Sequence, residues 1–229
     1  MKRKVGIINY KLNNLSSIYY MIKNLNHNPL FLDDTNHEVD ILIIPGVGSY
    51  SHGIKELKKK KFDKMIFNHI EKGKTLIAIC LGFQFLFEQS YEFGLTDGLG
   101  IIKGRVIPFG ENCNKVNIGW GKVLLNDHNK AIPKNLINEK YFYHVHSFHA
   151  EFLDNKKILS YSFNNDYKFP SAACFDNVYG FQFHPEKSGE DGKQLLKHIL
   201  DKWRNLKSKY NFYQNCLLYT SPSPRDATL

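Results

Sequence analysis

The 229-residue sequence has few cysteines, no long apolar run and no leader-like start. Its four cysteines are widely spaced, which excludes a disulfide-scaffold protein and fits a reducing cytosol. No run approaches the roughly 20 apolar residues that are needed to cross a bilayer. The basic N-terminus leads into a short strand-like run and lacks the apolar segment and cleavage site of a signal peptide. We therefore expect a cytoplasmic protein that does not bind a membrane.

Arginine is also scarce, although the chain is basic. There are 31 Lys+Arg residues against 22 Asp+Glu, and a net charge of +9 can indicate nucleic-acid binding. Only Arg3, Arg105, Arg204 and Arg225 carry the forked guanidinium that readers of bases and phosphates favour. The densest basic run, residues 58–61, is flanked by acidic residues, as on a solvated surface. We therefore expect no nucleic-acid partner.

The first hundred residues alternate between apolar runs and helical patterns. The runs predict strands at residues 5–8, 29–32, 41–44 and 76–79. The helical patterns cover residues 16–25 and 54–72, and a further helix is expected from residue 81. Short apolar runs separated by helices are typical of buried parallel strands in an α/β sheet.

After residue 100 the pattern changes to short alternating segments with Gly, Asn and Pro breaks. These predict antiparallel strands at residues 103–108, 121–125, 141–146, 158–163 and 172–175, then a strand at 178–183 and a helix from 189 to about 210. No linker-like stretch separates the halves. We expect one α/β domain over residues 1–210, with a mixed, mainly parallel central sheet flanked by helices and an antiparallel extension. Residues 216–229, with two prolines, are interpreted as a non-native or disordered tail.

The strongest chemical signal is the segment Ile77-Ala78-Ile79-Cys80-Leu81-Gly82. An apolar strand that ends in Cys and is followed by Gly and a helix predicts a nucleophile elbow. Such a turn presents its side chain at the carboxyl end of the sheet, where α/β proteins bind ligands. The following helix would favour the thiolate. The alternative is a buried structural cysteine.

A thiolate nucleophile needs a base, and the base needs an orienting carboxylate. His184 follows the predicted strand at 178–183, and Glu186 lies two residues further on. A cluster of His144, His146 and His149 could suggest a metal site. No cysteine or carboxylate accompanies it at zinc-like spacing, so we expect no metal.

A third piece follows the strand at 41–44, where the sequence reads Pro45-Gly46-Val47-Gly48-Ser49. Two glycines directly after a buried strand let backbone N–H groups point inward. Such a loop can form an oxyanion hole. The three pieces all stand at expected strand ends.

Together, the motifs at 45–49, 80–84 (Cys-Leu-Gly-Phe-Gln) and 184–188 (His-Pro-Glu-Lys-Ser) resemble those of the class I, triad-type glutamine amidotransferases. Within this family the chain is most similar to the glutaminase subunits of imidazole glycerol phosphate synthases. Ile118-Gly119-Trp120 and His146-Ser147-Phe148 add to that similarity. The resemblance covers about residues 4–205 and implies a flavodoxin-like fold without a cofactor.

The resemblance also implies roles for individual residues. Cys80 would attack the side-chain amide of L-glutamine, His184 would carry the proton to the departing ammonia, and Glu186 would orient His184. The oxyanion hole would be formed by Gly46, Val47, Gly48 and Leu81. Glutamine would be bound by Gln84, His146, Ser147 and Phe148.

Ammonia would pass to a (βα)₈-barrel cyclase subunit in a heterodimer. That partner would make imidazole glycerol phosphate and an aminoimidazole carboxamide ribotide in histidine biosynthesis. Asn13, Trp120 and Lys187 match positions near the docking face.

Four departures from the family pattern leave alternatives open. The usual Asp-Tyr-Gly-x-Gly-Asn segment has Asn9, Lys11 and Asn13 in place of the acid and both glycines, and Gly121 stands where Asn is usual. These changes resemble a paralogous branch found with surface-polysaccharide genes, whose partners aminate a nucleotide sugar. A non-catalytic subunit that only supports its partner is a second alternative.

Overall fold

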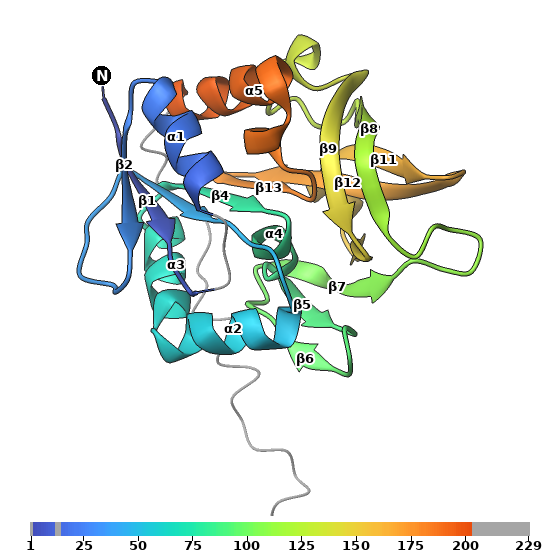
Figure 1. Cartoon of the computed structure of the whole chain (residues 1–229), viewed down its shortest axis with the longest axis horizontal. Coiled ribbons are helices and arrows are strands. Elements are labelled where there is room, and N and C mark those ends of the chain that lie inside the picture. Colours follow the sequence, from blue (N-terminus) through green and yellow to red (C-terminus); the bar gives the residue numbers. More distant parts are fainter. Residues whose placement is uncertain (1, 12–14, 203–229) are drawn as a thin grey trace, which may run out of the picture.

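The computed structural model of the protein describes residues 2–11 and 15–202, and these form a mixed α/β fold with two sheets (Figure 1). The main sheet has the strand order β2-β1-β3-β4-β13-β12-β11-β8-β9. Its parallel part consists of β2 (Asn28–Leu32), β1 (Lys4–Ile8), β3 (Ile41–Ile44), β4 (Thr75–Ile79) and β13 (Val178–Phe181). Its antiparallel extension consists of β12 (Tyr167–Phe175), β11 (Ile158–Asn164), β8 (Asn117–Leu125) and β9 (Lys140–His146). The predicted fold class is confirmed.

A smaller sheet lies beside the main one. It has the order β10-β7-β5-β6 and consists of β10 (Phe148–Phe152), β7 (Ile102–Pro108), β5 (Phe87–Ser90) and β6 (Thr96–Asp97). The helices are α1 (Ser16–Asn24), α2 (Tyr50–Lys59), α3 (Phe62–Glu71), α4 (Leu81–Gln84) and α5 (Gly189–Asp201). Short 3₁₀ turns are η1 (Lys134–Leu136), η2 (Asn155–Lys157) and η3 (Pro185–Lys187). No helix within these described residues is long and apolar enough to cross a membrane.

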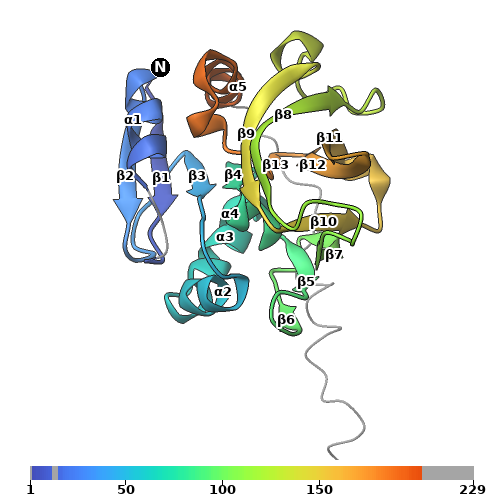
Figure 2. The same cartoon turned by 45° about the vertical axis from the view of Figure 1, so that its right-hand side comes forward.

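Both faces of the parallel strands are covered by helices. Along β3, Leu42 and Ile44 join a buried cluster with α2 and α3, while Ile41 and Ile43 join a second cluster with α1 and α5. Figure 1 shows α1 and α5 above the strands and α2 and α3 below them, and Figure 2 shows α5 and the pair α2 and α3 on opposite sides of β4 and β13. Apolar side chains on both faces explain why the strands read as continuous apolar runs.

The predicted helix over residues 54–72 was wrong, because the structure has two helices there. The chain breaks at Lys61, which has a φ of 61°. In one continuous helix, Leu57 and Phe62 would point roughly 140° apart at 100° per residue. The break allows both side chains to be fully buried in the same cluster.

Several other elements differ from the predictions, and β6 and β10 were not predicted at all. The helix after Cys80 is one turn long, α4, and the chain then enters β5, which was not predicted. β8 and β12 start earlier than expected, at Asn117 and Tyr167, because the strands run through Gly119 and Pro170. β13 ends at Phe181, two residues early. The predicted helix beyond residue 202 and the predicted tail at 216–229 lie outside the described residues.

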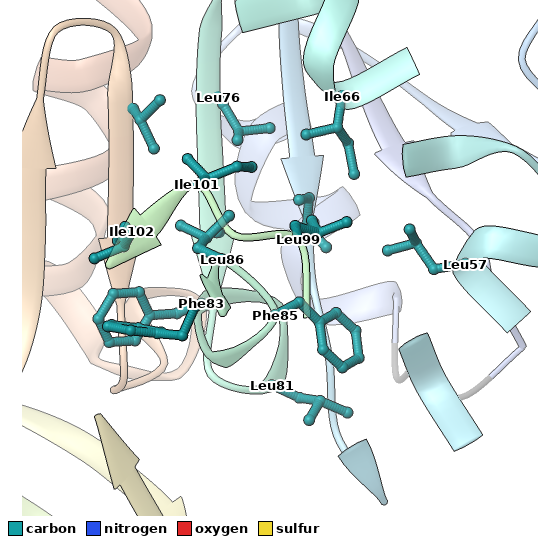
Figure 3. Close-up of a cluster of buried hydrophobic side chains, with 14 of the residues drawn as sticks. Leu57, Ile66, Leu76, Leu81, Phe83, Phe85, Leu86, Leu99, Ile101 and Ile102 are labelled. Atoms are coloured by element: carbon teal, nitrogen blue, oxygen red, sulfur yellow. The ribbon is translucent and has the colours of Figure 1, made fainter. Parts of the chain in front are cut away.

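The segment after Cys80 is held by apolar packing rather than by helix length. Leu81, Phe83, Phe85 and Leu86 are buried in one cluster with residues of α2, α3 and β4 (Figure 3). This packing fixes the turn that carries Cys80 against the core.

Candidate active site

Cys80 lies on a sharp turn between β4 and α4 and is 5% exposed. Its backbone has a φ of 51° and a ψ of −108°, a conformation that L-residues rarely adopt. The Cys80 N–H donates to the Phe181 carbonyl at 2.7 Å. A side chain at Gly82 would overlap the Ile44 carbonyl oxygen, so glycine is needed for the turn to pack on β3. The predicted elbow is present, and it is strained.

His184 reaches the same edge of the sheet because β13 pairs in parallel with β4. Its backbone N–H donates to the Tyr143 carbonyl at 2.8 Å, which ties it to β9. Its ring Nδ1 lies 2.7 Å from Oε1 of Glu186, and both side chains are buried. A carboxylate can only accept, so Nδ1 carries the hydrogen and Nε2 is the atom that can exchange a proton.

The electrostatics of the site favour a charged imidazole. Burial alone lowers the pKa of His184, but the charge of Cys80 and the hydrogen bond and charge of Glu186 outweigh burial and raise this pKa to about 10. Cys80 therefore lies near enough to His184 to act on it electrostatically. A thiolate beside an imidazolium is the protonation state that nucleophilic attack requires.

The Glu186→Gln variant should lose activity at lower pH than the wild type. The acid form of His184 persists until the pH rises through its raised pKa, and removing the Glu186 charge removes one cause of that rise. The alkaline limb of kcat/KM for glutamine should therefore move down in pH. An alkaline limb that stays in place would contradict the assigned role of Glu186.

The loop at residues 46–48 lies against the elbow. The Leu81 N–H donates to the Gly46 carbonyl at 3.4 Å, and the buried hydroxyl of Tyr10 donates to the Pro45 carbonyl at 2.6 Å. Gly48 has a φ of 110°, which suits glycine. In this conformation the Leu81 N–H donates to the loop, so an oxyanion could accept from this N–H only after the Gly46 carbonyl has moved away.

The expected glutamine-binding residues lie beside Cys80. Gln84 is buried, and its Nε2 donates to the Phe148 carbonyl at 3.0 Å. His146 Nδ1 lies 2.8 Å from the same carbonyl. Cys80 Sγ is 3.9 Å from the Val145 carbonyl, so the strand that ends at His146 runs past the thiol. Ser147 follows it, and its carbonyl accepts from Phe109 at 3.5 Å.

Two buried polar residues were missed from the sequence. Gln182 accepts from Gln84 Nε2 at 3.1 Å, and its own Nε2 lies 3.8 Å from Cys80 Sγ. Glu92 is 9% exposed and accepts from the Tyr50 N–H at 3.3 Å, just after the loop at 46–48. Burial raises the pKa of Glu92, partly offset by that backbone hydrogen bond. Gln182 could have been selected from the sequence because it lies two residues before His184. No feature of the sequence indicated Glu92.

The expected docking residues are only partly described. Trp120 is 58% exposed on β8 and makes an edge contact with Tyr143, whose carbonyl holds His184. The backbone N–H of Lys187 donates to the His184 carbonyl at 3.0 Å in η3. Both therefore border the His184 side of the site, whereas Asn13 lies outside the described residues.

The three clustered histidines contact aromatic rings and one another rather than acids. Phe109 stacks on His149 at 4.7 Å, and His144 Nδ1 lies 3.2 Å from His146 Nε2. In the described part of the chain, no three His, Cys, Asp or Glu side chains gather as a metal-ion site.

A buried cysteine on a strained elbow, close to a histidine that is hydrogen-bonded to a carboxylate, is the arrangement expected of a cysteine-dependent amidohydrolase. A family model described as glutamine amidotransferase class-I matches residues 9–203, and the chain belongs to this family. It is thus a glutamine amidotransferase, an enzyme that releases ammonia from glutamine.

The similar curated proteins are more specific. The chain is 35% identical over 210 residues to the imidazole glycerol phosphate synthase subunit HisH of Sulfurimonas denitrificans, covering 89% of this chain and all of that protein. The HisH subunit of Pyrococcus furiosus is 34% identical, covering 86% and 97%. Among solved structures, PurLQS from Thermotoga maritima matches with a TM-score of 0.68 and 22% identity over 88% of this chain and 99% of that one, which supports the fold.

Proposed function

We propose that the chain is the glutaminase subunit of an imidazole glycerol phosphate synthase. It hydrolyses glutamine to glutamate and ammonia and passes the ammonia to a (βα)₈-barrel cyclase partner in histidine biosynthesis. The observation that carries this proposal is the arrangement of Cys80, His184 and Glu186 in a chain that matches HisH subunits along nearly their whole length.

The proposed reaction starts with attack of Cys80 Sγ on the amide carbon of glutamine. The carbonyl oxygen becomes an oxyanion and takes the Leu81 N–H from the Gly46 carbonyl. His184 gives its Nε2 proton to the amide nitrogen, the C–N bond breaks, and ammonia leaves a thioester on Cys80. His184 then takes a proton from water, the hydroxide adds to the thioester carbon, and the C–S bond breaks, which releases glutamate and restores the Cys80 thiolate beside the protonated His184.

Glu92 supports the choice of a free amino acid as substrate. Glutamine carries an ammonium group, which needs an anionic partner when it is withdrawn from water. Glu92 is a buried carboxylate that accepts a hydrogen bond from the Tyr50 N–H, and it follows the elbow in the chain. We assign it to the ammonium end of glutamine.

The partner is expected to sit on the His184 side of the site, over Trp120 and Lys187. An exposed tryptophan is a frequent centre of binding energy in protein interfaces. Its edge contact with Tyr143, next to the backbone of His184, connects this face to the catalytic base.

The proposal is tested by mixing the purified chain with a cyclase barrel subunit and following glutamate and imidazole glycerol phosphate. Both products should form only in the complex. Trp120→Ala should weaken partner binding by about 30-fold, measured by calorimetry. Leu153→Ala, an exposed apolar truncation away from β8, is the matched control. Equal affinity for both variants would contradict the docking face.

The sugar-amination alternative is favoured by one observation. Lys11 has a φ of 72°, and its N–H donates to the Asn9 side chain at 3.2 Å, in a segment where the family pattern has glycine. A lysine held in this strained turn alters a part of the docking segment. Stimulation of glutamate release by a nucleotide-sugar amidotransferase, and not by the cyclase barrel, would establish this alternative.

A further inference from the structure

Two histidines on β9 are buried side by side and are joined by a hydrogen bond. His144 is 1% exposed and His146 is 7% exposed. His144 Nδ1 lies 3.2 Å from His146 Nε2, and Ser162 Oγ lies 3.4 Å from His144 Nε2. At the other end, His146 Nδ1 lies 2.8 Å from the Phe148 carbonyl. These contacts form a continuous chain from β11 to the glutamine-binding segment.

The Phe148 carbonyl sets the direction of every hydrogen bond in this series of contacts. A carbonyl can only accept, so His146 must carry its hydrogen on Nδ1. A neutral His146 then has a bare Nε2, which must accept, and His144 must donate to it from Nδ1. His144 Nε2 in turn accepts from the Ser162 hydroxyl. Asn117 Nδ2 lies 3.1 Å from the same bare Nε2, so Asn117 and His144 share this one acceptor.

Both imidazoles are neutral, as this assignment requires. Burial, with a smaller contribution from His184, lowers the pKa of His144 to about 3. Burial, with a smaller contribution from His144, lowers the pKa of His146 well below its usual value. Each ring therefore has one donor and one acceptor at neutral pH.

The position of the His144 ring depends on Gly121 of β8. A Cβ at position 121 would lie 2.9 Å from Cδ2 of His144 and 3.1 Å from Nε2, closer than side chains normally pack. The absence of a side chain at 121, where the family tends to have Asn, is what leaves room for the imidazole. The buried position of the His144 imidazole on β9 thus requires glycine at position 121 of β8.

The Phe148 end of this hydrogen-bond series lies next to Cys80. The Phe148 carbonyl accepts from both His146 and Gln84, and the backbone before it passes 3.9 Å from Cys80 Sγ at Val145. We propose that His144 is a positioning residue: by donating from Nδ1 to the bare Nε2 of His146 it keeps the His146 ring against the Phe148 carbonyl and so holds residues 146–148 in the conformation that binds glutamine. This inference rests on the proposed glutaminase function.

The test compares three variants of His144 in the complex with the barrel partner. His144→Phe keeps the ring but removes the donor, and should raise KM for glutamine about tenfold with kcat within about twofold. Asn presents an amide near the Nδ1 position, so His144→Asn should restore KM to within about threefold of wild type. Gln reaches toward the Nε2 position instead, so His144→Gln should behave like His144→Phe.

Two further measurements separate positioning from packing. The ¹⁵N resonance of His146 Nε2 should move in His144→Phe and His144→Gln but not in His144→Asn, because only the last keeps a donor at position 144, while Asn117 still contacts Nε2 in all three variants. Gly121→Ala, which displaces the ring without removing a polar group, should also raise KM. If His144→Phe fails to fold, the Asn and Gln variants decide the question.

Equal KM values for His144→Asn and His144→Gln, or an unmoved His146 resonance in His144→Phe, would overturn the inference and leave the glutaminase proposal standing. Absence of glutaminase activity in the wild-type complex would instead refute the proposed function. The NMR measurement on the free chain would still report the hydrogen-bond chain.

Discussion

The Cys80→Ala variant is expected to lose at least about 10⁴-fold of its glutamine-dependent turnover, because the thioester forms on this sulfur. The other cysteine buried in the described residues, Cys174, is no substitute: burial, the first of several causes, raises its pKa to about 12, so it stays a thiol. The measurement is glutamate release in the complex with the partner.

Two controls make the Cys80 result specific. The same complex should keep full synthase activity when ammonium salt replaces glutamine, since that reaction needs only the partner's site. Cys174→Ala should retain glutaminase activity. Substantial glutamate release by Cys80→Ala would remove the triad mechanism.

The Gly46→Ala variant should lower kcat by about 10²–10³-fold, the usual effect of losing one oxyanion donor. A Cβ at Gly46 would overlap the Tyr10 hydroxyl and come within 2.8 Å of Leu81 Cβ and 3.0 Å of the Gly82 nitrogen. The loop would move, and with it the carbonyl that exchanges with the oxyanion at the Leu81 N–H.

The matched control for Gly46 is Gly110→Ala, since a Cβ at position 110 meets no atom within 4 Å and the residue has no positive φ. Tyr10→Phe tests the same loop more gently, because it removes only the hydroxyl that holds Pro45. Thermal unfolding of all three variants separates loss of turnover from loss of fold. An unchanged kcat for Gly46→Ala in a folded protein would show that this loop does not contribute to the oxyanion site.

The parts of the fold that could be predicted are those with strong local signals. β3 and β4 are short, fully buried runs that end just before Pro45 and Cys80, and runs of this length are too short for a buried helix. Of the small sheet only β7 was predicted, because β5 reads as a continuation of the helix after Cys80 until its pairing with β7 decides otherwise. The break at Lys61 could not be predicted, because it depends on the tertiary packing that buries Phe62 in the same cluster as Leu57.

The site divides in the same way. His184 and Glu186 are two residues apart, so their ion pair follows from local geometry at a strand end. The contact between the Leu81 N–H and the Gly46 carbonyl joins segments 35 residues apart and depends on how closely two loops approach. Gln182 could be suspected from its place before His184, but its contact with Gln84 depends on the packing of β13 against α4.

The strained backbone of Cys80 also bears on whether the chain still performs chemistry. A non-glycine residue at this φ and ψ costs about 1–3 kcal/mol of folding stability, and glycine at the same position would relieve most of it. In a subunit that only supports its partner allosterically, replacing Cys80 by glycine would increase folding stability and would not impair function. A thiol in an unfavourable backbone conformation, beside a histidine–glutamate pair, is the arrangement expected of an active hydrolase and not of a subunit that has lost its activity.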